Sequence, residues 1–87
     1  MQVQIKKPTD SQIKLIKSRP TWQCGISKFD WSYDSRETAL ILEGEVIVTY
    51  GDGKSVHIAE GDYVTFPAGL SCVWDVRKPI KKHYMFD

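Results

Sequence analysis

The chain has no long hydrophobic run, no disulfide framework and no strong excess of charge. No apolar stretch approaches the ~20 residues needed to span a bilayer, and the first seven residues do not resemble a signal peptide. Two cysteines occur in 87 residues, and 12 Lys and Arg balance 11 Asp and Glu to a net charge of +1. These features predict a cytoplasmic protein with free thiols, without a membrane or nucleic-acid partner.

Length and turn signals together predict a single all-β domain. A chain of 87 residues accommodates one domain, which we divide into an N-terminal arm, residues 1–20, and a barrel core, about residues 21–86. About six short β-prone runs follow one another in this core, separated by glycine-containing turns. Short strands at close spacing, without a long helix, are typical of a sandwich or barrel.

The N-terminal arm carries two weaker local signals. Residues 3–5 alternate apolar and polar side chains, as a short edge strand does, and such an edge is a candidate surface for a homodimer. The turn at residues 8–11 is suited to capping a brief helix with Ile13 and Ile16 on one face. Ile13 and Leu15 also fit strand alternation, so both interpretations of this segment stay open.

Within the core, the strand predictions rest on alternation and on glycine. Residues 38–42 and 46–50 are predicted as two strands joined by a tight turn at residues 43–45, and Gly-Asp-Gly at residues 51–53 predicts a hairpin. Residues 71–76 complete the series before a last strand near the C-terminus.

Two sets of residues share the spacing of known sequence motifs. The first set, with intervals of five, one, three and six residues, is Gly25, Trp31, Tyr33, Glu37 and Gly44. The second set, with intervals of five, one, two and three residues, is Gly61, Pro67, Gly69, Cys72 and Val76. In this spacing the chain resembles the cupin superfamily, whose motifs read G-x5-H-x-H-x3,4-E-x6-G and G-x5-P-x-G-x2-H-x3-N. The resemblance implies an antiparallel jelly-roll β-barrel over about residues 21–86.

A finer resemblance rests on four shorter segments. Residues 37–38, 41–44 and 66–74 and the ending at residues 82–84 are similar to the small single-domain cupins grouped with (S)-ureidoglycine aminohydrolase. This grouping implies a neighbourhood of folds rather than one reaction.

The departures from the cupin motifs concern the metal ligands. Trp31 and Tyr33 stand where the first motif has histidines, and Cys72 stands where the second has one, so Glu37 alone remains of the usual four ligands. Two donors do not make a tight site for a first-row metal. We therefore predict no metal and no other cofactor; the alternative is a weakly held divalent ion at Glu37 and Cys72.

Glu37 and Cys72 are the candidate catalytic residues. A carboxylate between aromatic walls is suited to general acid or base catalysis, but a structural carboxylate bonded to Tyr33 or an arginine explains Glu37 equally well. Cys72 is a candidate nucleophile or oxidation sensor if its pKa is lowered. A buried cysteine is also a common small core residue.

Aromatic residues are the candidate ligand-binding residues. Alternation around Trp31 and Tyr33 places both rings on one side of a strand, and Trp74 is expected to join them as a stacking platform for a planar or sugar-like ligand. Simple filling of a metal-free barrel explains the same residues. We expect either Lys82 or Tyr84, both on the last strand, to line the pocket mouth.

Three functions are consistent with these residues. The first is a metal-independent cupin that binds or transforms a small polar metabolite. The second is a dimerising scaffold with a closed barrel. The third is a metal-assisted ureide or amidine aminohydrolase, which is disfavoured because the required ligands are missing.

Overall fold

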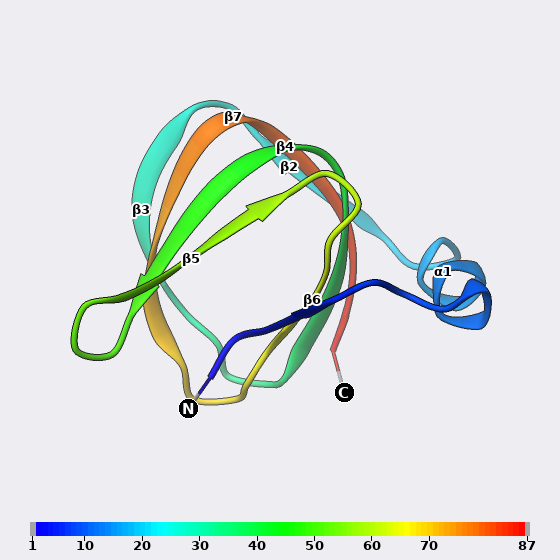
Figure 1. The fold of residues 1–87 in the computed structure, drawn as a ribbon, viewed down its shortest axis with the longest axis horizontal. Helices are drawn as coiled ribbons and strands as arrows, with labels where there is room; N and C mark the ends of the chain where they lie inside the picture. Colours follow the sequence, from blue (N-terminus) through cyan, green and yellow to red (C-terminus); the bar gives the residue numbers. More distant parts are fainter. Residues whose placement is uncertain (1, 87) are drawn as a thin grey trace.

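Two long antiparallel strands, β4 (Glu37–Tyr50) and β7 (Ser71–Phe86), form the centre of the structure (Figure 1). The computed structural model describes residues 2–86, which form seven strands and one short helix. The other elements are, in chain order, β1 (Gln4–Lys6), α1 (Asp10–Ile16), β2 (Thr21–Cys24), β3 (Ser27–Ser32), β5 (Lys54–Ala59) and β6 (Tyr63–Phe66). Every strand pairing is antiparallel, so the predicted antiparallel all-β fold is confirmed.

The sheet curves because each long strand has different neighbours along its two halves. The first half of β4 pairs with β6 and the second half with β5, while β7 lies along both halves. On its other edge, β7 pairs first with β3 and then with β2. Within residues 2–86 no pairing joins β3 to β5 or β1 to β2, so the sheet wraps around the core without closing edge to edge (Figure 1).

Gly44 lies in a bulge in the middle of β4, where the sequence predicts a tight turn over residues 43–45. The pairing with β7 shifts register here but the strand continues, so the prediction of a tight turn is wrong. Gly44 has a φ of 97°, and a Cβ at this position would meet the carbonyl oxygen of Pro79 and, at 2.7 Å, the Cα of Ile80. Glycine is therefore what allows the two backbones to approach here, and the bulge bends β4 around the core.

Strand β7 is longer than the sequence predicts, because the strand expected at residues 71–76 and the expected last strand are continuous. Residues 71–76 and the segment around Lys82 belong to one strand, β7, which passes Pro79 opposite the bulge of β4. Proline cannot donate a ladder hydrogen bond and is tolerated in strands at such irregular points. The continuity of β7 matters for the site, because it brings Lys82 inside the same curved sheet.

Helix α1 lies outside the curve of the sheet (Figure 1). It begins with a capping box: the Thr9 hydroxyl accepts a hydrogen bond from the Gln12 backbone, and the Gln12 side chain accepts one from the Thr9 backbone. Ile16 is fully buried against Leu40 and Tyr63. The predicted helix is confirmed, and the alternative strand interpretation of this segment is wrong. Among residues 2–86 no helix is long and apolar enough to cross a membrane.

The core fills the inside of the curved sheet. Val46 and Val48 on β4, Ile58 on β5 and Val76 on β7 are fully buried and belong to one cluster. Burying each such side chain contributes about 1.5–3 kcal/mol. The predicted hairpin at residues 51–53 joins β4 to β5.

The predicted N-terminal edge strand is β1. It pairs with β6, and within the described part of the chain its other edge has no partner strand.

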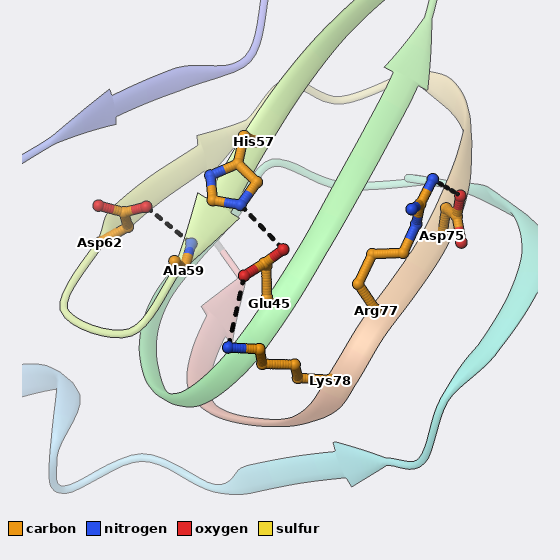
Figure 2. A network of polar contacts seen from close by, with 7 residues as sticks. All are labelled: Glu45, His57, Ala59, Asp62, Asp75, Arg77 and Lys78. Atoms are coloured by element: carbon orange, nitrogen blue, oxygen red, sulfur yellow. Dashed lines mark hydrogen bonds and ion pairs between the residues drawn. The ribbon is translucent and has the colours of Figure 1, made fainter.

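Charged side chains cover the outside of the sheet (Figure 2). Glu45 on β4 lies 3.3 Å from His57 Nε2 on β5 and 3.9 Å from Lys78 Nζ on β7. The Asp62 carboxylate accepts a hydrogen bond of 2.8 Å from the Ala59 backbone and closes the turn after β5 (Figure 2). His57 is exposed. Exposed ion pairs of this kind contribute little to stability, about 0–1 kcal/mol.

Gly44→Ala tests the bulge. We expect a loss of about 2–4 kcal/mol in the free energy of unfolding, because the new Cβ adopts an unfavourable φ and collides with the β7 backbone. Gly25→Ala is the matched control, since no atom lies within 4 Å of its Cβ position, and it should change stability by less than about 0.5 kcal/mol. Urea denaturation measures both; equal effects of the two substitutions would contradict the role assigned to Gly44.

Candidate functional site

A pocket of about 220 Å³ opens between β2, β3, the start of β4 and β7. Seven of its nine lining residues are aromatic and two are charged. They are Trp22, Phe29, Trp31, Tyr33, Glu37, Trp74, Lys82, Tyr84 and Phe86. Each strand contributes side chains from alternate positions, because successive residues of a strand point to opposite faces of the sheet.

A buried ion pair forms the polar part of this pocket. Glu37 is the first residue of β4 and is 3% exposed, while Lys82 lies in the second half of β7 and is 6% exposed. The Lys82 ammonium donates a hydrogen bond of 2.6 Å to Glu37 Oε2. Buried charges persist in proteins when they are paired in this way, because each satisfies the other in the absence of water.

Aromatic rings surround the Lys82 ammonium. Its Nζ lies 4.8 Å from the ring centroid of Trp74 and 5.1 Å from that of Trp22. The rings of Phe66 and Tyr84 follow, each at 5.9 Å. A cation within about 6 Å of an aromatic face is attracted by the negative charge density of the ring. The rings therefore offset part of the hydration that the ammonium loses on burial.

Tyr33 links the aromatic wall to the core. Its ring stacks on Phe66 with centroids 4.7 Å apart, and its hydroxyl accepts a hydrogen bond of 3.2 Å from Trp74 Nε1. Burial raises the pKa of Tyr33 well above its usual value, and the negative charge of Glu37 raises it further. The hydroxyl consequently stays protonated at neutral pH and keeps its hydrogen available for donation.

Comparison with known proteins identifies the family. A family described as the EutQ-like cupin domain matches residues 15–84. The chain belongs to this cupin family. The jelly-roll barrel implied by the two sequence motifs is thereby confirmed.

Solved structures agree with this assignment. A DUF861 family protein from Thermotoga maritima is 48% identical over 99% of this chain and 100% of its own, with a TM-score of 0.94. The EutQ protein of Clostridium difficile is 20% identical over 74% of this cupin and 50% of its own chain, with a TM-score of 0.67. A cupin superfamily protein from Desulfitobacterium hafniense is 18% identical over 99% and 79%, with a TM-score of 0.60. A search of curated proteins found no match. The last two structures share the fold alone, and none of these names states a reaction.

The donor set of this cupin does not fit a first-row transition metal. The motif positions hold Trp31, Tyr33 and Cys72, and the remaining ligand, Glu37, is bonded to Lys82. Both histidines lie outside the pocket lining. Among residues 2–86, no three His, Cys, Asp or Glu side chains converge as metal ligands. The positive charge beside the Glu37 carboxylate is the Lys82 ammonium.

Cys72 is buried beside the pocket but is not one of its lining residues. Its thiol belongs to the core cluster and lies 3.6 Å from the Trp31 carbonyl oxygen. Burial raises the pKa of Cys72 from 9.0 to about 11, against smaller lowering effects of Trp74 and Lys82. The thiolate that a nucleophile requires is therefore scarce at neutral pH, and the geometry lends this role no support.

The pocket unites most of the residues that the sequence singled out. Trp31, Tyr33, Glu37 and Trp74 all line it. The arginine or Tyr33 partner considered for Glu37 is replaced by Lys82.

The structure also shows lining residues that the sequence did not fully predict. Lys82 and Tyr84 both line the pocket, where the sequence predicted one of them. Phe86 continues the same alternation along β7, a signal that would have found it. Trp22 comes from β2, which no motif marks.

The rate of alkylation of Cys72 tests whether its thiol is buried and protonated in the folded protein. In Cys24→Ser, where Cys72 is the sole thiol, the folded protein should react with iodoacetamide at least on the order of 100-fold more slowly near neutral pH than the urea-unfolded chain. The pKa rise from 9.0 to about 11 leaves less thiolate, and burial of the side chain restricts access of the reagent. The rate should still rise between about pH 9 and pH 11. A folded rate within threefold of the unfolded one would show an activated thiol.

Proposed function

We propose that this cupin binds a small polar metabolite in the aromatic pocket, without a metal ion, through the Glu37–Lys82 pair. The observation that supports the proposal is a buried ion pair on the wall of a pocket that is otherwise aromatic. Pockets of this composition, apolar with a few convergent polar groups, are the usual form of a small-molecule site. Its volume of about 220 Å³ is below the ~300–1,000 Å³ of drug-sized sites, so the ligand is small.

Packing alone does not account for the ion pair. Replacement of a buried ion pair by apolar side chains of similar size is often neutral or stabilising. A barrel that needed only to be filled would therefore gain nothing from Glu37 and Lys82. Their presence beside solvent-accessible space supports a role in recognition.

Each group has a distinct role in this proposal. Lys82 donates hydrogen bonds, Glu37 accepts them, and Tyr33 contributes its protonated hydroxyl. Trp31, which is 50% exposed at the pocket rim, provides a face on which a ring stacks. Where the ligand is transformed, Glu37 is the proposed general acid or base, and Cys72 supports the wall by packing.

The finer resemblance to ureidoglycine aminohydrolase cupins adds ureides to the candidate ligands. A metal-assisted aminohydrolase reaction is the least supported form of the proposal, because the donor set offers no place for the ion. Amino-acid derivatives and sugars complete the set of ligands to be screened.

A second candidate is a dimerising scaffold with no ligand. The observation that favours it is the edge of β1, which has no partner strand among residues 2–86, since such edges are ready to pair with another chain. Ile5 on this strand is 39% exposed.

Thermal-shift screening with ureides, amino-acid derivatives and sugars tests the binding function. A ligand at about 100 times its Kd stabilises the folded state by about 2.7 kcal/mol, which raises the Tm of a domain of this size by on the order of 10 °C. Glu37→Gln should reduce this rise by more than half, because it removes the charged acceptor in the pocket.

The matched control is Glu45→Gln, the same chemical change on the outer face of the same strand. It should leave the shift intact. A chain that binds none of the ligands, and that is dimeric by light scattering, would contradict the binding proposal in favour of the scaffold.

A further inference from the structure

The Glu37–Lys82 pair offers a ligand a donor and an acceptor side by side. The ammonium has three N–H groups and uses one of them on Glu37 Oε2. A carboxylate has acceptor sites on both of its oxygens, and the bond to Lys82 occupies one of these sites. A ligand that enters the pocket therefore meets hydrogen-bond donors and acceptors on adjacent groups.

The aromatic rings hold this pair in a fixed arrangement. Trp22 on β2 and Trp74 on β7 lie within 5.1 Å of the ammonium, and their rings meet edge to face at 80°. The ammonium thus occupies a cation-binding cage formed by its own chain. The aromatic rings and Glu37 both attract the Lys82 ammonium. A ligand therefore binds beside the intact ion pair and does not displace the ammonium.

The charge of the pocket selects an uncharged ligand. Glu37 and Lys82 are the two charged members of its lining, and their formal charges cancel. A cationic ligand would face Lys82 in a cage that is already filled. An anionic ligand would gain Lys82 but would lie against Glu37. In a site of low dielectric either charge would remain uncompensated.

The shape of the pocket selects a flat ligand. Seven of the nine lining side chains are aromatic, and aromatic walls favour rings that stack or meet them edge to face. Phe29 and Trp74 are themselves stacked, with their ring centroids 6.1 Å apart and an angle of 17° between their planes.

We infer that the ligand is an uncharged planar heterocycle with a ring N–H next to a ring carbonyl, as in a lactam or a cyclic imide. The N–H donates to Glu37 and the carbonyl oxygen accepts from Lys82, while the ring packs between the aromatic walls. The inference rests on the proposed binding function and adds the charge, the shape and the hydrogen-bonding edge of the ligand.

Four small probes test this class by protein NMR titration, which detects weak binding. 2-Pyridone has the full N–H and C=O edge, and N-methyl-2-pyridone lacks the donor. Benzoate and benzamidinium are planar and carry a negative and a positive charge. We expect 2-pyridone to bind at least tenfold more tightly than each of the other three, with shifts centred on Trp22, Trp74 and Lys82. Equal or tighter binding of any other probe, or no binding of 2-pyridone, would overturn the inference.

Two variants test whether the preference for 2-pyridone depends on the Glu37–Lys82 ion pair. Lys82→Met should abolish the preference for 2-pyridone and increase the affinity for benzamidinium at least tenfold, because it removes the ammonium and leaves the Glu37 carboxylate unpaired. Glu37→Gln, which retains an oxygen that accepts from Lys82, should lower the affinity for 2-pyridone at least fivefold, and Glu45→Gln should leave it unchanged. Unaltered selectivity in a folded Glu37→Gln protein would overturn the inference. If a ureide or sugar binds the pocket and 2-pyridone does not, the inference fails while the binding function stands.

Discussion

The central constraint on this structure is that a lysine ammonium and a glutamate carboxylate lie together inside a small barrel. Removing either charge from water costs several kcal/mol even after relaxation. The 2.6 Å hydrogen bond between Lys82 and Glu37 offsets part of that cost, and four aromatic rings around the ammonium offset more. The pair is separated by 45 residues in the chain, so its formation requires the barrel to be assembled.

The course of the two long strands is what brings the pair together. Glu37 begins β4, and Lys82 follows the irregular point at which β7 passes the bulge at Gly44. A Cβ at Gly44 would push the two backbones apart at Pro79. The bulge, the curvature of the sheet and the position of the ammonium are therefore parts of one arrangement.

Sequence patterns predicted the features of the molecule that are determined by residues close together in the sequence. The spacing of glycines, proline and Glu37 indicated the cupin barrel, and alternation indicated the aromatic side of β3, because a strand places every second side chain on one face. For Lys82 the sequence indicated only that it or Tyr84 lies at the pocket mouth; its burial and its pairing with Glu37 could not be predicted in this way. It stands in a basic segment that resembles a solvated surface, and lysine is almost never buried without a partner. Its partner is far away in sequence, and so is Trp22, which reaches the pocket through the pairing of β2 with β7.

Gly44 illustrates a second limit of the sequence. A glycine between two acidic residues is a usual turn signal, and only the close approach of Pro79 shows that it serves a bulge instead. The fold was thus more accessible to prediction than the chemistry of its pocket. Within the cupin fold this chain keeps the carboxylate of the cupin motif and places an ammonium beside it, which agrees with the general separation of fold and function.

A double-mutant cycle on the free energy of unfolding tests the buried pair most directly. Lys82→Met should cost about 3–5 kcal/mol, because it leaves a buried carboxylate unpaired. Adding Glu37→Gln should restore part of this loss, with a coupling energy of about 1–3 kcal/mol. The same cycle on the exposed pair of Glu45 and Lys78 should give a coupling below about 0.5 kcal/mol. Additive effects of the Glu37 and Lys82 substitutions, within about 0.5 kcal/mol, would contradict the account.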